Sequence, residues 1–184
     1  MKQALLVVDM QEIFFDLPEN ALYQRDRLTT KVNQLIAQAR TVDCPVIFIQ
    51  HTSYTAGEDL YVDTPEWEIY HKLDRQDKDP VFRKTKWDAF YQTELLPWLQ
   101  KNQIQQLIFA GAQTEFCIDT SMRAAYSLGY QQNIVIKDGT STLDSSVLHA
   151  DQIIAHHENV WNGRFAQVLS VEDVQFDYGY YSAI

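Results

Sequence analysis

The sequence has no apolar run long enough to cross a membrane. The first apolar stretch in its 184 residues is ALLVV at 4–8, which is five residues long and is followed by an aspartate. A secretion signal needs an apolar region of about 7–15 residues, and a spanning helix needs about 20. We therefore expect a cytoplasmic protein that has no contact with membranes.

Positive charge and cysteine are also scarce. The chain has 15 basic and 25 acidic residues, a formal net charge of −10, and no block of Lys or Arg. Such a charge repels a phosphate backbone, so nucleic acid is excluded as an expected partner. The two cysteines, Cys44 and Cys117, could form one disulfide, but in the cytoplasm we expect two free thiols.

Short apolar runs alternate with helical patterns along the chain. The runs lie at 4–8, 45–49, 106–110 and 133–137, and a shorter one, PVFR, at 80–83. Continuous apolar runs are typical of parallel strands buried on both faces. Helical patterns cover 28–40, 93–101, 115–128 and 147–157. The alternation predicts an α/β fold of three layers, with a mainly parallel, Rossmann-like sheet flanked by helices. With no repeat or linker, residues 1–184 are predicted to form a single domain.

Residues 52–80 depart from this alternation. The segment carries aromatic and acidic side chains, among them Tyr54, Asp59, Tyr61 and Trp67. Loops of this length in compact domains are usually lids or binding loops. The composition hints at a cationic or aromatic ligand, because cation–π and carboxylate contacts are both available.

Polar residues stand at the carboxyl ends of the predicted strands. They are Asp9, His51, Lys84, Cys117 in the turn after 106–110, and Asp138. In open parallel sheets these ends meet at one edge, where ligands bind. We therefore expect Asp9, Lys84 and Cys117 to converge on an active site.

The setting of Cys117 favours a reactive thiol. Thr114 is placed to cap a helix, which puts Cys117 in the first helical turn, where unpaired N–H groups favour an anion. A lysine nearby lowers the pKa of such thiols, and a carboxylate can take the thiol proton. The alternative is that Cys117 is a small buried apolar residue, as most free cysteines are.

The other polar residues also have structural interpretations. Asp9 could cap a helix, and Lys84 could belong to a solvated basic turn with Arg83 and Lys86. We expect a loop hydrogen bond from His51 and turn chemistry at Asp138. The remaining candidates lack a metal-ligand spacing such as HExxH and are predicted to lie on the surface: His149, His156 and His157.

Three motifs allow the sequence to be compared with a known family. They are LLVVDMQ at 5–11, FRKTKWDAF at 82–90 and GAQTEFCIDTSMRAAYSLGY at 111–130. Together they resemble the isochorismatase-like cysteine hydrolases, over roughly residues 4 to 157. The resemblance implies the isochorismatase-like hydrolase fold and a catalytic set of Asp9, Lys84 and Cys117. The chain departs from the family's K-x-x-x-S-A-F pattern by carrying Asp88 at the serine position.

The resemblance also implies the details of the site. These are a cis peptide bond between Ala112 and Gln113, and an oxyanion hole formed by the N–H groups of Gln113 and Cys117. Asp9 would accept the proton of Cys117, with Lys84 orienting the thiolate. The thiolate would attack an amide-type carbonyl of a small molecule, an amine would leave, and water would clear the thioester.

No cofactor is expected. Metal-binding nicotinamidases use a D-x-H segment after the second strand, but here this region reads QHTSYT at 50–55. We therefore predict a site without a catalytic metal.

Other functions remain open. Family members that cleave the isochorismate vinyl ether do not need the cysteine, and a non-catalytic binding or assembly protein could keep the fold. The spacing from Cys117 to Arg123 is that of cysteine phosphatases, but the intervening loop contains Asp119 and no glycine. Both features oppose wrapping of that loop around a phosphate.

Aromatic residues give the last two predictions. A substrate pocket could be lined by Trp67, Trp87, Phe90 and Trp161, each of which is an equally good core residue. The segment 174–184, VQFDYGYYSAI, carries more aromatic surface than a free terminus should expose. It packs either on its own domain or on another subunit, and because family members are commonly homo-oligomers, we predict self-association.

Overall fold

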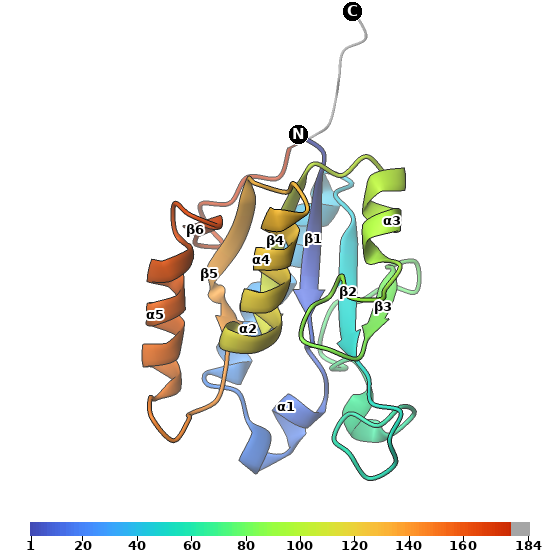
Figure 1. Cartoon of the computed structure of the whole chain (residues 1–184), viewed down its shortest axis with the longest axis vertical. Helices are drawn as coiled ribbons and strands as arrows, with labels where there is room; N and C mark the ends of the chain where they lie inside the picture. Colours follow the sequence, from blue (N-terminus) through green and yellow to red (C-terminus); the bar gives the residue numbers. More distant parts are fainter. Residues whose placement is uncertain (178–184) are drawn as a thin grey trace, which may run out of the picture.

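The computed structural model describes residues 1–177 and contains a six-stranded, fully parallel sheet (Figure 1). The order of the strands across the sheet is β3-β2-β1-β4-β5-β6. Their bounds are β1 Gln3–Val8, β2 Val46–His51, β3 Val81–Lys84, β4 Gln106–Ala112, β5 Asn133–Ser141 and β6 Ala166–Leu169. The predicted parallel α/β architecture is therefore confirmed.

Helices cover both faces of the sheet (Figure 1). The α-helices are α1 Ile13–Asp16, α2 Arg25–Thr41, α3 Leu95–Lys101, α4 Asp119–Ser127 and α5 Ala150–Trp161. Two 3-10 turns, η1 Pro18–Asn20 and η2 Pro65–Trp67, and a π-helical turn, η3 Thr114–Ile118, complete the described elements. None of the helices within residues 1–177 combines the length and apolarity needed to cross a membrane.

Alternation along each strand divides the core into two clusters. Leu5 and Val7 of β1 point to the face covered by α2, whereas Ala4, Leu6 and Val8 point to the face covered by α3 and α4. The same rule places Ile47 and Ile49 of β2 on the α4 face. Side chains at the strand ends inherit these directions, because successive residues of a strand point to opposite faces.

The strand order has a switch point between β1 and β4. The chain moves outward from β1 through β2 to β3, and then returns to the other side of β1 as β4. In doubly wound sheets the crevice at this point, outside the carboxyl ends of the strands, is where ligands bind. Asp9 follows β1, and the turn that leads to Cys117 follows β4.

Residues 52–80 form a long connection that is anchored rather than free. Trp67, Tyr70 and Leu73 are buried, and the ring of Tyr70 stacks on Phe15 with centroids 3.8 Å apart. Gln11 and Gln50 both donate to the carbonyl oxygen of Trp67, at 2.7 and 2.9 Å. The two longest exposed stretches of the segment are 54–59 before Trp67, with Tyr54 at the surface, and 74–78 after Leu73.

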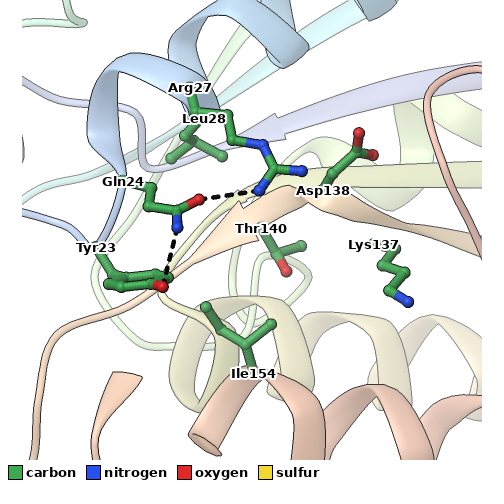
Figure 2. Close-up of a pocket in the computed structure, with 8 residues that line it drawn as sticks. All are labelled: Tyr23, Gln24, Arg27, Leu28, Lys137, Asp138, Thr140 and Ile154. Carbon is green, nitrogen blue, oxygen red and sulfur yellow. Dashed lines mark hydrogen bonds between the residues drawn. The ribbon is translucent and has the colours of Figure 1, made fainter. Parts of the chain in front are cut away.

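Asp138 has a structural role, although not in a turn as expected. It lies inside β5, where the pairing with β4 shifts register. Its carboxylate pairs with Lys31 of α2 at 2.9 Å and accepts the N–H of Val171 at 3.0 Å. It lines a small pocket of about 100 Å³ between α2, β5 and α5 (Figure 2), and this pocket does not include the predicted catalytic residues.

The segment after β6 packs on its own domain as far as it is described. Val174 is buried, Phe176 packs against the α2-side core, and the N–H of Asp177 donates to Gln3 Oε1 at 2.8 Å. The tyrosines at 178, 180 and 181 lie outside the described residues. Self-association therefore stays a prediction.

Gly111, near the end of β4, is required by the close approach of β1. Its φ is +121°, and an added Cβ would lie 2.1 Å from the carbonyl oxygen of Val8. Gly111→Ala should therefore lower the free energy of unfolding by at least about 2 kcal/mol, through strain and backbone clash together. Urea denaturation of the purified variant measures this change.

Gly57→Ala is the matched control for this prediction. Gly57 also has a positive φ, +88°, but nothing lies within 4 Å of the added Cβ. Only the conformational cost of about 1 kcal/mol should remain. Equal losses in the two variants would show that the contact with Val8 does not matter.

Candidate active site

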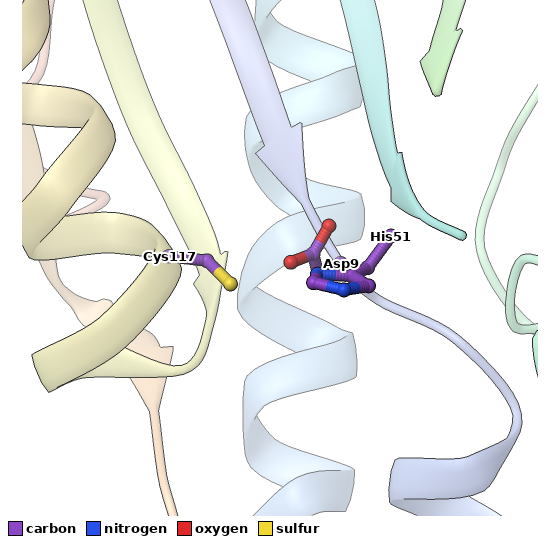
Figure 3. A group of neighbouring side chains, drawn as sticks. All are labelled: Asp9, His51 and Cys117. Carbon is purple, nitrogen blue, oxygen red and sulfur yellow. The ribbon is translucent and has the colours of Figure 1, made fainter. Parts of the chain in front are cut away.

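The structure brings Asp9, Lys84 and Cys117 together at the switch point. Lys84 Nζ lies 2.7 Å from Asp9 Oδ2 and 3.1 Å from Cys117 Sγ. Figure 3 shows Asp9 after β1 and Cys117 at the start of the helical segment that follows β4, with His51 from β2 beside them. All three predicted catalytic residues are buried.

Strand alternation explains why these side chains meet. Phe82 of β3 packs on the α4 face, so Lys84, two residues later, points to the same face. In β2, Ile47 and Ile49 face α4, and His51 follows them in the same alternation. His51 and Lys84 are also direct partners in the register of β2 and β3.

Lys84 is a buried cation surrounded by acceptors. Its ammonium also lies 3.0 Å from His51 Nδ1 and donates to the carbonyl oxygen of Lys86 at 3.1 Å. Burial by itself lowers the pKa of Lys84, but the charge of Asp9 and the hydrogen bonds to Asp9 and Cys117 raise it above its usual range. Lys84 therefore stays protonated near neutral pH.

Asp9 is held in a left-handed backbone conformation, with φ at +46°. Its N–H donates to the carbonyl oxygen of Ile49 at 2.9 Å, which ties the residue to β2. One carboxylate oxygen pairs with Lys84, and the other, Oδ1, is buried without a hydrogen-bond partner among residues 1–177. Asp9 can therefore act as a base toward a group within reach of Oδ1.

Cys117 lies in a π-helical turn, not in an α-helix capped by Thr114. The residue before the turn is Gln113, and the Thr114 hydroxyl is buried without a hydrogen-bond partner in the described chain. The prediction of a Thr114 cap is therefore wrong. Cys117 does lie at the start of the helical segment, as expected.

The expected lowering of the pKa of Cys117 is also wrong. Burial raises the pKa of this thiol above its usual range, and the negative charge of Asp9 raises it further. Lys84 acts in the opposite direction but does not outweigh the other two effects. The resting residue is therefore a thiol beside a carboxylate.

His51 belongs to the site, which the sequence interpretation missed. The N–H of His51 donates to Gln11 Oε1 and its carbonyl oxygen accepts from Gln11 Nε2, both at 2.9 Å. Burial and the charge of Lys84 lower the pKa of His51. The position of His51 at the carboxyl end of β2 was a signal in the sequence that it belongs to the site. The sequence interpretation instead gave His51 only a structural hydrogen bond in a loop.

The turn before Cys117 contains the predicted cis peptide bond, between Ala112 and Gln113. The N–H of Gln113 donates no hydrogen bond within residues 1–177, and the first π-type bond of η3 runs from the N–H of Ile118 to the carbonyl oxygen of Gln113. Gln113 and Cys117 thus remain the candidates for an oxyanion hole.

Asp9, His51 and Cys117 each offer an atom of a type that binds metals. One such atom from each lies within 4.8 Å of the others. The Lys84 ammonium is within 3.1 Å of all three side chains and already contacts the groups that would bind a cation. A metal would have to displace this ammonium, and the absence of a catalytic metal stays a prediction.

The predicted aromatic pocket is only partly supported. Trp161 is fully buried, with Nε1 donating to Asp119 at 2.7 Å, and Trp67 is buried with Nε1 donating to Thr52 at 2.9 Å. Trp161 is therefore a core residue, whereas Trp67 lines a different pocket, together with Gln50 and Arg83, that does not include the predicted catalytic residues. Phe90 is partly buried against the α4-side core. Trp87 is exposed and stacks with exposed Phe116, the residue before the predicted nucleophile, at 6.0 Å between centroids.

Asp88, which replaces the family's serine, has a local role. Its Oδ1 accepts the N–H of Phe90 at 2.8 Å. The neighbouring N–H of Ala89 donates to Ser121 Oγ of α4 at 2.9 Å. The first bond fixes the local conformation of the segment after Lys84, and the second ties this segment to α4.

Comparisons with known proteins agree with this geometry. Residues 3–173 match the family model of the Isochorismatase domain. A solved structure described as an isochorismatase family protein is 43% identical, with a TM-score of 0.85 over 92% of this chain and 98% of that chain. The chain therefore belongs to the isochorismatase family of hydrolases, and both the resemblance and the fold predicted from the sequence are confirmed.

Two curated relatives have lower identity. The uncharacterized isochorismatase family protein YddQ of Bacillus subtilis (strain 168) is 26% identical over 177 residues, covering 94% of this chain and 98% of YddQ. Streptothricin hydrolase of Streptomyces noursei is 31% identical over 142 residues, covering 77% of this chain and 50% of that protein.

The buried pair of Asp9 and Lys84 predicts non-additive effects on stability. Lys84→Met leaves a buried carboxylate without its cation and should lower the free energy of unfolding by about 3–5 kcal/mol. Asp9→Asn removes the negative charge that pairs with the buried ammonium and should also destabilise. The double variant should lose clearly less than the sum of the two single losses, as measured by urea denaturation. Strict additivity would contradict the coupling between the two charges.

Proposed function

We propose that this member of the isochorismatase family hydrolyses an amide-type C–N bond of a small molecule through a thioester on Cys117. The observation that carries the proposal is the buried contact of one ammonium with both a carboxylate and a thiol: Lys84 Nζ lies within 3.1 Å of Asp9 and Cys117. This set supplies a nucleophile, a base and a fixed positive charge in one place.

The first step is activation of the thiol. Asp9 Oδ1, which has no partner among the described residues, accepts the proton of Cys117. Lys84 remains protonated and lies against the sulfur, so it stabilises the thiolate as it forms. Because burial and Asp9 raise the pKa of Cys117, the proton leaves only as the thiolate attacks. The reactive anion therefore does not accumulate in the free enzyme.

The second step forms the thioester. The sulfur attacks the carbonyl carbon, and the N–H groups of Gln113 and Cys117 are the proposed donors to the developing oxyanion. The C–N bond breaks, and the proton held by Asp9 passes to the leaving nitrogen. Water then attacks the thioester and gives one proton to Asp9. The S–C bond breaks, and the proton returns to Cys117.

Two alternatives make different use of the site. Vinyl ether hydrolysis needs no cysteine nucleophile, so the contact between Lys84 and Cys117 would have no catalytic purpose. A binding protein would gain nothing from burying a lysine between a carboxylate and a thiol, since such buried pairs rarely add stability. The similarity to a protein named streptothricin hydrolase supports hydrolysis of a small molecule. These considerations favour the amidase reaction.

The test is hydrolysis of a panel of primary amides and carbamoyl compounds, scored by release of ammonia. Wild type should release ammonia from at least one member. Cys117→Ala should lose turnover by at least about 10³-fold, because the nucleophile is gone. Asp9→Asn should lose about 10²–10⁴-fold, the usual contribution of a positioned acid–base group.

Cys44→Ala is the matched control. Cys44 is the second buried cysteine, and burial raises its pKa to about 12, but it has no contact with the catalytic set in the described chain. Its replacement should leave kcat within about twofold. Ammonia release that survives Cys117→Ala would contradict the thioester mechanism. Release of pyruvate from isochorismate with no activity on any amide would favour the vinyl ether reaction.

A further inference from the structure

His51 is held rigidly at the edge of the catalytic set. Both its backbone N–H and its carbonyl oxygen are bonded to the side-chain amide of Gln11, which is itself fully buried. The same amide also donates to Trp67, which fixes its orientation. The imidazole is thus carried on a backbone segment that is bound on both sides, as groups that orient a substrate need to be.

Contact with Lys84 determines which nitrogen of His51 carries the proton. Lys84 is protonated, so at 3.0 Å its ammonium donates to His51 Nδ1, which must be the acceptor nitrogen. In a neutral imidazole the proton is then on Nε2. Nε2 makes no hydrogen bond within residues 1–177 and is not among the buried atoms without partners, so it reaches solvent.

We propose that His51 is a substrate-binding residue whose Nε2–H donates to a second acceptor of the substrate, beside the carbonyl group that Cys117 attacks. The proposal rests on the proposed amidase function and assigns a class of substrate to it. That class is an amide with an additional carbonyl oxygen, ring nitrogen or similar neutral acceptor close to the scissile group.

The remaining donors of the site are already used, which leaves this role to His51. Lys84 is directed at Asp9, His51, Cys117 and the Lys86 carbonyl oxygen. The N–H groups of Gln113 and Cys117 are assigned to the scissile oxygen. A site with an unused donor discriminates strongly against analogues that lack the acceptor, because the donor then stays unpaired.

The charges around His51 keep it neutral. Lys84 and Lys86 both lower its pKa, together with burial as the largest effect, and Asp9 alone raises it. The Cys117 thiol completes the surrounding set and is uncharged at rest. Protonation below the ordinary value of 6.5 would turn Nδ1 from an acceptor into a donor facing the Lys84 ammonium. Activity should therefore fall on the acid side, with a midpoint below 6.5.

Two variants separate the functions of the two ring nitrogens. His51→Asn keeps an acceptor near the position of Nδ1 but removes the donor at Nε2, whereas His51→Gln keeps a distal donor and loses the acceptor for Lys84. Substrates are compared in pairs of equal shape, such as pyridine-3-carboxamide, which has a ring acceptor, and benzamide, which does not. His156→Asn, at an exposed histidine on α5, is the control.

His51→Asn should lower kcat/KM about tenfold for the amide with the acceptor, mainly through KM, and less than about twofold for its partner. His51→Gln should preserve the preference for the acceptor, although with a lower kcat. The acid midpoint below 6.5 should disappear in His51→Asn and persist in His156→Asn. Equal losses for both amides in His51→Asn would overturn the proposal while leaving the amidase function intact.

A measurement on the protein without substrate tests the role of His51 independently of the proposed amidase function. Nitrogen-15 NMR of the ring, assigned by its absence in His51→Asn, should show a neutral Nε2–H tautomer at pH 7. In Lys84→Met the Nδ1–H tautomer should appear as well. An imidazolium or an Nδ1–H tautomer in wild type would overturn the proposal even if no amide in the panel is hydrolysed.

Discussion

The arrangement of this site depends on one buried ammonium. Lys84 Nζ has three N–H bonds and lies within 3.1 Å of four acceptors. They come from the residue after β1, from β2, from the turn after β3 and from the helical turn η3. A cation in such a place is stable only while its acceptors remain. Its presence assigns the proton of His51 to Nε2 and places a positive charge against both the carboxylate of Asp9 and the sulfur of Cys117.

The fold supplies the geometry at a cost in stability. Three of the four acceptors, on Asp9, His51 and Lys86, lie at or just after the ends of β1, β2 and β3. Strand alternation directs the side chains of Lys84 and His51 toward the α4 face. Gly111 allows β4 to approach β1, which places the turn carrying Cys117 opposite Asp9. An apolar side chain at position 84 with a neutral one at position 9 would pack the same space without buried charge. The buried ion pair is therefore better explained by the proposed reaction than by stability.

Much of this architecture could be predicted from the sequence, because buried parallel strands leave continuous apolar runs and the polar residues after them share one edge. The set of Asp9, Lys84 and Cys117 followed from that rule and from the family motifs. β6 was missed because AQVL is a short, half-exposed edge strand with little pattern. His51 was missed because its partnership with Lys84 depends on the register of β2 and β3, which no local pattern encodes.

The errors at the site have a common physical origin. The expected cap at Thr114 and the expected low pKa of Cys117 both assumed a regular, partly solvated helix start, whereas the turn is π-helical and both side chains are buried. Trp67 and Trp161 were pocket candidates on composition alone, but both are buried and the indole N–H of each donates to a side chain of the domain. Burial decides such cases, and burial is a property of the whole fold.

The central claim is that the Lys84-linked pair of Asp9 and Cys117 forms a thioester with an amide substrate. The most direct test is the intact mass of wild type quenched in acid during turnover of the fastest amide. We predict that the protein gains the mass of the acyl group. A digest should locate this group on the peptide that contains Cys117, and hydroxylamine should remove it. The assay is repeated in a low-water solvent, which slows hydrolysis of the thioester. Steady release of ammonia without any adduct under these conditions would contradict the thioester mechanism.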